Sequence, residues 1–194
     1  EQIVKYHIKN SPIEEISADE IEANNKREVD FDYSAIKDVE ITSVVNGAMD
    51  FDRELMIGIL TIPELDVNLP IIKELTDETL IAGSATMKPD KAIGQGNYTL
   101  AGHKMKNKSL LFGSLMDIEI GTTVMLSDKN TVYEYKIYET AVVPDTAMNM
   151  LDDERAEDRG KPIVSLMTCY HSSKTGKRFF ALGELIDMYP AEEI

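Results

Sequence analysis

The chain contains one cysteine, Cys169, at the end of the apolar run 163–168, and an arginine, Arg178, after the loop 170–177. If the flanking strands pair antiparallel, Cys169 and Arg178 face each other at roughly 5 Å between Cβ atoms. A fixed guanidinium favours the thiolate form of a cysteine and can hold a developing oxyanion. The spacing therefore indicates a nucleophilic thiol beside a cation. The alternative is structural, because a lone cysteine at a strand end is most often a small buried hydrophobe.

A histidine, His103, ends a second strand-like run, directly after Ala101 and Gly102. Such small residues allow another backbone or a ligand to approach closely. A histidine placed there can act as a general acid or base, since its ordinary pKa is near neutral. A histidine held by a local hydrogen bond explains the segment equally well. His171 competes as the partner of the thiol, but catalytic pairs normally come from separate elements.

Composition excludes several classes of protein and site. The 194 residues include 20 Lys and Arg against 35 Asp and Glu, a formal net charge of −15. This charge argues against nucleic-acid binding and against docking on anionic lipid through a basic surface. One cysteine excludes an internal disulfide and a cysteine-rich zinc site. With only three histidines in addition, we expect no metal and no cofactor.

No apolar run approaches the roughly 20 residues that span a bilayer. The sequence begins at Glu1 without an initiator Met. We therefore expect a trimmed or mature chain. Whether a membrane anchor stood upstream of it stays open at this point.

Strand-like patterns dominate from about residue 55 onward. β-branched and apolar runs predict strands at 56–62, 67–72, 97–104, 122–126, 132–143, 162–169 and 178–188. Pro70 indicates that the strand at 67–72 is an edge strand or a bulged strand. A short helix is expected at 74–82, a helical turn at 110–116, and a long acidic loop at 144–161, in which 152–154 form a solvated face. Many short strands with few helices indicate a mainly β protein built as a closed or nearly closed barrel.

Acidic residues concentrate in the first part of the chain, where residues 1–50 contain 12 Asp and Glu against 5 Lys and Arg. A helix is expected to start at Ser11-Pro12 or at Ser17, which fits a capping box. A second apolar cluster follows at Phe31, Tyr33, Ile36 and Val39. We divide the chain into an N-terminal appendage, 1–50, and a barrel domain, 51–194. A largely mobile, solvated arm is the alternative for residues 1–50.

Three motifs taken together resemble the signature of the sortases: Thr99-Leu100-Ala101-Gly102-His103, then Ser165-Leu166-Met167-Thr168-Cys169, then Arg178. Ser165 stands where the family motif has Thr, a change that keeps the hydroxyl. The resemblance covers about residues 55–188. It is nearest to class A, because the arm has no Asp-Pro-aromatic motif and 144–161 holds no long helical insertion. It implies a closed sortase-like β-barrel of about eight strands, with short helices and an N-terminal helical or extended appendage.

The resemblance also implies an activity and a place in the cell. Sortases of this kind are cysteine transpeptidases of Gram-positive bacteria. The chain would cleave an LPXTG-like sorting signal between Thr and Gly through a thioester. It would then join the surface protein to an amine of a peptidoglycan precursor resembling lipid II. It would act at the extracellular face of the cell membrane, held there by the anchor that precedes this chain.

Carried onto this sequence, the resemblance assigns a role to each site residue. Cys169 is the nucleophile, His103 the general acid and then base, and Arg178 the group that binds substrate and holds the oxyanion. Thr168 contributes its backbone N–H to the oxyanion hole. The groove for the Leu-Pro portion of the signal is lined by the loop 145–160 and by Ala101, Leu80 and Ala82.

A calcium site found in part of class A uses acidic residues just before the histidine strand. Here that stretch holds Lys88, Lys91 and Gln95, which are poor ligands for a cation that requires several oxygen atoms. We therefore expect calcium-independent activity.

Two other functions remain open from the sequence. One is a cysteine hydrolase that uses water as the acceptor, and the other is a non-catalytic β-barrel binding module in which Cys169 is structural. A further hypothesis concerns residues 1–50, whose net charge of −7 and sparse apolar residues are compatible with a weakly docked regulatory cover.

Overall fold

The computed structural model describes residues 16–29, 31–36, 53–89 and 91–191. The expected helix start at Ser11-Pro12 and the apolar residue Val39 lie outside these ranges, as does the proposed boundary at residue 50. No helix within the ranges is both long and apolar enough to cross a membrane.

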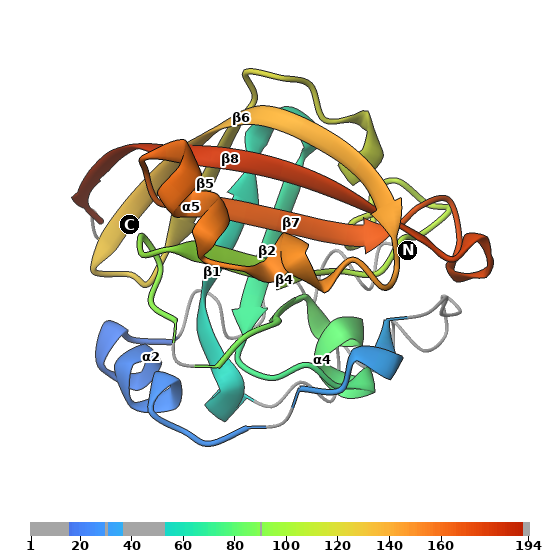
Figure 1. Ribbon diagram of the computed structural model, residues 1–194. Helices are drawn as coiled ribbons and strands as arrows, with labels where there is room; N and C mark the ends of the chain where they lie inside the picture. The colour runs from blue at the N-terminus through green and yellow to red at the C-terminus, as the bar shows by residue number, and fades with distance from the viewer. Residues whose placement is uncertain (1–15, 30, 37–52, 90, 192–194) are drawn as a thin grey trace.

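Eight strands form a closed barrel, in the order β1-β2-β3-β4-β7-β8-β6-β5 (Figure 1). β2 runs parallel to β3 and β4 runs parallel to β7, whereas all other neighbours are antiparallel. This arrangement confirms the predicted mainly β barrel. The strands are β1 (Met56–Ile62), β2 (Val67–Ile72), β3 (Ser84–Thr86), β4 (Asn97–Ala101), β5 (Thr123–Ser127), β6 (Thr131–Pro144), β7 (Ile163–Cys169) and β8 (Lys177–Pro190).

Short helices connect and cover the strands. Among the residues that the structure describes, three are α-helices: α2 (Ala18–Asn25), α4 (Asp77–Ala82) and α5 (Glu154–Arg159). Six others within the same ranges are short 3-10 helices: η1 (Tyr33–Ala35), η2 (Arg53–Leu55), η3 (Pro63–Leu65), η4 (Leu115–Asp117), η5 (Met148–Leu151) and η6 (Ser173–Thr175). The helix expected from residue 74 begins at Asp77 because Thr76 caps it: its hydroxyl accepts from the N–H of Thr79 at 3.3 Å, and the Thr79 hydroxyl accepts from the N–H of Thr76 at 3.0 Å.

The barrel interior is filled by one buried cluster, the core cluster. It draws side chains from nearly every strand, so the alternate inward-facing residues meet in the middle. β7 differs from the other long strands because all seven of its residues are buried, as expected for a strand covered on both faces. The largest fully buried members of the core cluster are Tyr135, Phe112, Ile16, Met56, Leu60, Ile62, Ile71, Leu100 and Leu110.

The prediction that Pro70 marks an edge strand is wrong. β2 lies between β1 and β3, and the sequence reading missed β3, which has only three residues. Proline cannot donate to a strand ladder. It is tolerated here because β3 pairs with β2 only at Ile71 and Ile72, after the proline.

The described part of the N-terminal region is docked on the barrel. The Ser17 hydroxyl caps α2 by accepting from the N–H of Glu20 at 3.1 Å, which confirms the second of the two expected helix starts. Ile21 of α2 belongs to the core cluster. The side-chain amide of Asn24 donates to the carbonyl oxygen of Met56 at 2.8 Å. The alternative of a mobile, solvated arm is therefore wrong for α2.

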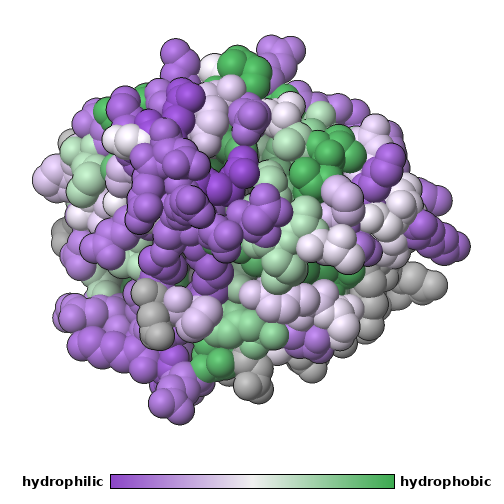
Figure 2. All heavy atoms as spheres, in the orientation of Figure 1, coloured by the Kyte–Doolittle hydropathy of each residue, from purple (hydrophilic) through white to green (hydrophobic). Residues whose placement is uncertain are grey.

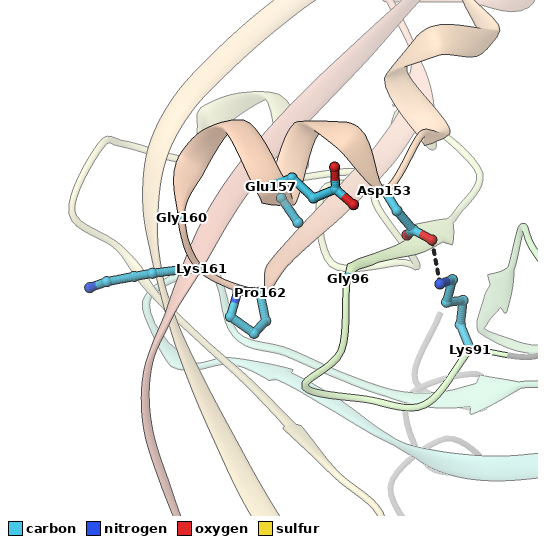
Figure 3. A pocket seen from close by; sticks show the side chains of 8 residues that line it. Lys91, Gly96, Asp153, Glu157, Gly160, Lys161 and Pro162 are labelled. Carbon is cyan, nitrogen blue, oxygen red and sulfur yellow. Dashed lines mark ion pairs between the residues drawn. The ribbon is translucent and has the colours of Figure 1, made fainter.

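Several polar contacts hold the loop between β6 and β7 against the barrel, and the carboxylate of Asp153 makes three of them. Its Oδ1 accepts from Lys88 Nζ and from the N–H of Asn97, both at 3.0 Å, and its Oδ2 pairs with Lys91 (Figure 3). The side-chain amide of Asn97 also donates to the carbonyl oxygens of Met150 and Asp152. The expectation of a solvated face at 152–154 is therefore wrong for Asp153.

The outer surface of α5, which follows Asp153, is hydrophilic (Figure 2). The four exposed side chains of this helix are Glu154, Glu157, Asp158 and Arg159. The outward face of α5 is thus exposed to solvent, whereas Asp153, just before the helix, contacts the barrel.

Asp153 is held in its ionised form by its partners. Burial alone would raise the pKa of this carboxyl group. Hydrogen bonds from Lys91, from the N–H of Asn97 and from Lys88 outweigh that effect and hold the pKa well below its usual range. Because the native pKa is lower than the unfolded one, the stabilisation is complete above the ordinary Asp pKa of about 3.9 and is lost as the pH falls through the native value.

We expect Asp153→Asn to lower the free energy of unfolding by on the order of 1 kcal/mol at pH 7, since the carboxylate is partly exposed and solvent screens each pair. For a domain of this size the melting temperature should fall by about 2–4 °C. Thermal melts of the wild type and the variant at several pH values measure this. The difference between their melting temperatures should become smaller below about pH 4.

The matched control is Asp152→Asn, which makes the same charge change at an exposed neighbour and should shift the melt less. Equal shifts for the two variants would contradict a specific role for Asp153.

Candidate active site

Cys169 and Arg178 are direct partners across two strands. β7 and β8 pair antiparallel, with Cys169 opposite Arg178 in the register. This is the pairing predicted from the loop between them. Facing residues on one side of such a ladder have neighbouring Cβ atoms, so both side chains emerge at the same end of the barrel. Cys169 is only 1% exposed and half-buried Arg178 lies above it at the start of β8.

His103 reaches the same place from the other side of β7. β4 and β7 run parallel with Ala101 beside Met167, and the N–H of Gly102 donates to the carbonyl oxygen of Met167 at 3.0 Å. β4 ends at Ala101, and His103 follows two residues later. The imidazole is 2% exposed. β7 therefore has the strand that leads to His103 on one side and the strand that carries Arg178 on the other.

The competing histidine lies in a different environment. His171 is exposed in the loop between β7 and β8, with a positive φ of 59°. Its ring stacks edge-on against Tyr170, with 4.3 Å between centroids. His171 thus lies exposed on the loop, whereas His103 is buried.

Gly102, directly before His103, allows close packing of the Phe112 ring. A Cβ atom on Gly102 would lie 2.4 Å from the ring of Phe112, closer than any real contact. A backbone does approach Gly102, that of Met167, but the space that the absent side chain leaves is filled by an aromatic ring of the protein itself and not by a ligand. The N–H of Phe112 also donates to the carbonyl oxygen of His103 at 3.1 Å, so this ring and the histidine are fixed together.

Thr168 points away from the thiol. Neighbouring residues on a strand face opposite sides, and Thr168 pairs with Phe179, a member of the core cluster. Among the described residues its buried hydroxyl has no hydrogen-bond partner. The side chain therefore belongs to the barrel interior, and only the backbone of Thr168 remains available to the site.

A second buried cluster, here called the site cluster, surrounds the thiol. The structure brings the expected groove residues Leu80 and Ala101 into it, but not Ala82, which is buried elsewhere at the end of α4. Met150 and Leu151 join it from the 144–161 loop. Its members are Ala35, Ile36, Leu75, Leu80, Ala85, Met87, Ala101, Met150, Leu151, Met167, Cys169, Phe180 and Leu182.

The N-terminal region contributes two members of the site cluster, Ala35 and Ile36, and the sequence did not predict either as a site residue. Arg178 Nη2 donates to the carbonyl oxygen of Ile36 at 3.3 Å, and Nη1 donates to that of Lys177 at 3.3 Å. The apolar residues at 31–36 were visible in the sequence. Nothing in their spacing indicated which part of the barrel they would cover.

The open depression drawn in Figure 3 is a different place. It is bounded by α5 and by the segment before β4, and it includes Lys91, Asp153 and Lys161. Lys161 points away from it into solvent. None of the three candidate catalytic residues lines it. Among the described residues, no group of His, Cys, Asp and Glu is arranged to hold a metal ion.

The geometry supports covalent acyl transfer. A thiol, an imidazole and a guanidinium at the end of one strand provide a nucleophile, a proton carrier and a cation for an oxyanion. The apolar side chains of the site cluster surround them, and such surroundings exclude water.

Comparison with known proteins identifies the family. Residues 60–186 match the sortase domain. Sortase A of Listeria monocytogenes is 36% identical over 183 residues, covering 94% of this chain and 80% of that protein. Sortase A of Bacillus anthracis is 34% identical over 163 residues, covering 83% and 74%.

The fold agrees as well. The crystal structure of Listeria monocytogenes sortase A superimposes with a TM-score of 0.66 at 34% identity, covering 72% of this chain and 92% of that one. The barrel, the order of the motifs and these relatives together show that the chain belongs to the sortase family, as a cysteine transpeptidase most similar to class A.

Proposed function

We propose that this transpeptidase cleaves an LPXTG-like sorting signal between Thr and Gly and transfers the Thr carbonyl to an amine of a peptidoglycan precursor resembling lipid II. It would do so at the extracellular face of a Gram-positive cell membrane, tethered by an N-terminal anchor outside this chain. The observation that supports the proposal is the pairing of β7 and β8, which sets Arg178 opposite Cys169, together with the pairing of β7 with β4, the strand that leads to His103.

The first half of the reaction forms a thioester. The thiolate of Cys169 attacks the Thr carbonyl carbon and the C–N bond to Gly breaks. His103, as imidazolium, gives its proton to the departing amine. Arg178 faces the thiol from the neighbouring strand and stabilises the negative charge on the carbonyl oxygen.

The second half returns the enzyme to its starting state. The incoming amine attacks the thioester carbon, and the C–S bond breaks. Neutral His103 takes the proton that the amine loses, so the thiolate and imidazolium are restored. No other reactant is required, because one amide bond is exchanged for another.

The surroundings of the thiol favour an amine acceptor over water. Cys169 lies among apolar side chains such as Met167, Leu151 and Phe180. Water reaches such a thioester poorly, whereas a substrate amine is brought in by its own binding contacts. This supports the transpeptidase over the alternative of a cysteine hydrolase.

We expect Cys169→Ala to abolish cleavage of an LPXTG peptide and to prevent formation of the peptide–enzyme adduct. His103→Ala should reduce kcat/KM by about 10²–10⁴, the usual contribution of a general acid–base group. Peptide turnover followed by mass spectrometry of the intact protein measures both effects.

The matched control is His171→Ala, which removes an exposed imidazole two residues beyond the thiol and should leave turnover nearly unchanged. Retained turnover in Cys169→Ala would exclude the thiol as nucleophile. A large loss in His171→Ala would reassign the acid–base role.

The acceptor is identified from the products. With LPXTG peptide alone we expect slow release of the free acid. Addition of a primary-amine peptide should divert most product into a new amide, because the amine competes with water for the thioester. Chromatography with mass detection separates the two products. Unchanged yields of free acid at saturating amine would favour the hydrolase.

We expect turnover to be independent of calcium. The carboxylate of Asp153, in the loop between β6 and β7, is already paired with Lys88 and Lys91. The two ammonium groups oppose the approach of a divalent cation. Turnover measured in excess chelator and in millimolar Ca²⁺ should agree. A severalfold gain with Ca²⁺ would contradict the prediction.

A further inference from the structure

The last residue of α5, Arg159, contacts a barrel side chain that packs against the site. We propose that Arg159 is a positioning residue for peptide binding, because it joins the loop between β6 and β7 to Tyr138 beside the site cluster. The inference deepens the proposed function and rests on it only for the identity of the peptide.

Tyr138 is placed by an irregularity in β6. The register with β8 pairs Ile137 with Gly183 and Glu139 with Leu182, so that Tyr138 is the extra residue of a β-bulge. A bulge leaves one residue out of the ladder and changes the direction of its side chain. The half-buried Tyr138 packs against the site cluster, which contains the thiol. This side chain therefore connects the wall of the barrel with the surroundings of the thiol.

Arg159 contacts this ring and a carboxylate of the neighbouring strand. Its guanidinium carbon lies over the Tyr138 ring, 3.9 Å from the centroid, which is a cation–π distance. Its Nε donates to Glu184 Oε2 at 2.8 Å. This hydrogen bond lowers the pKa of the Glu184 carboxyl group, so the pair stays ionised at neutral pH. One side chain of α5 thus contacts both β6 and β8.

A second arginine of α5 reaches the same strand from the same side of the helix. Arg155 and Arg159 are four residues apart and therefore share one face of α5. Arg155 Nη2 lies 3.6 Å from Glu139 Oε2, a longer ion pair than that of Arg159. Figure 1 shows α5 on the outside of the barrel, in front of β8 and the start of β7. Arg159 therefore makes the closer of the two contacts between this face and the strands.

The position of α5 in turn affects the part of the loop that lies in the site. Asp153, directly before the helix, is fixed by the three contacts described above, and Arg159 fixes the opposite end. Met150 and Leu151 lie shortly before Asp153 and pack in the site cluster. A displacement of α5 would therefore move two apolar side chains that surround the thiol.

The role of Arg159 concerns binding and not the chemical step. A peptide that needs Met150 and Leu151 in place binds only to molecules in which the loop is ordered. Its apparent affinity falls by the fraction of molecules in that arrangement. The loss of Arg159 should therefore raise KM and leave kcat unchanged.

The test compares Arg159→Ala with a matched control, Lys161→Ala, in the full chain. Lys161 Nζ lies 4.0 Å from the same Glu184 carboxylate, but Lys161 points into solvent (Figure 3). The control thus removes a cation near Glu184 without removing the contact with Tyr138. Arg159→Lys is the conservative variant, which keeps the charge but lacks the planar group that stacks on an aromatic ring. Circular dichroism and thermal melts establish that each variant is folded.

Initial rates with an LPXTG peptide give KM and kcat for each protein. We expect Arg159→Ala to raise KM by about three- to tenfold, with kcat within about twofold of the wild type. Arg159→Lys should raise KM by about two- to threefold, and Lys161→Ala by less than about twofold. A variant that is only less stable would lower the active fraction and hence kcat, but would not raise KM.

A second measurement needs no peptide. The rate at which iodoacetamide alkylates Cys169, the one thiol in the chain, reports how closely the surrounding side chains cover it. Because a displaced loop exposes the thiol, we expect this rate to rise severalfold in Arg159→Ala. The rate in Lys161→Ala should stay near that of the wild type.

The two measurements separate this inference from the proposed function. Where the wild type cleaves the peptide, a higher KM with kcat retained supports the inference. A KM equal to that of Lys161→Ala, or a fall in kcat beyond about twofold, overturns it. If no protein cleaves the peptide, the LPXTG assignment fails and alkylation alone decides: a faster rate in Arg159→Ala than in Lys161→Ala supports the inference, and equal rates overturn it.

Discussion

The position of β7 between a parallel and an antiparallel neighbour is the constraint on which the site depends. The antiparallel pairing with β8 sets Arg178 opposite Cys169, and the parallel pairing with β4 ends at Ala101, two residues before His103. Backbone hydrogen bonds fix both registers, and a slip of one residue would turn each side chain to the opposite face. In the proposed mechanism, the ladders of this fully buried strand therefore position the thiol and the guanidinium relative to each other.

The surroundings of the site are set by less regular structure. The β6–β7 loop contributes Met150 and Leu151, and one carboxylate with two lysines holds it against the barrel. Such ion pairs are individually weak in water. The side-chain amide of Asn97 adds hydrogen bonds to two backbone carbonyl oxygens of this loop, which has little secondary structure of its own.

The buried thiol raises a conflict between protection and access. An apolar enclosure limits hydrolysis of a thioester, yet a peptide several residues long must enter it. The enclosure includes Ala35 and Ile36 of the N-terminal region, and the carbonyl oxygen of Ile36 accepts from Arg178.

The sequence by itself predicted the strand-rich barrel, offered Ser17 as one of two starts for α2, and named three candidate catalytic residues, because patterning and motif order are local properties. It could not show that β3 makes Pro70 an internal residue, that Phe112 fills the space at Gly102, or that Asp153 is paired. Only the tertiary structure decided these points, and also that Ala35 and Ile36 pack in the cluster that contains the thiol. Each depends on which distant segments meet when the barrel closes, and contacts between distant segments leave no periodic signal in the chain.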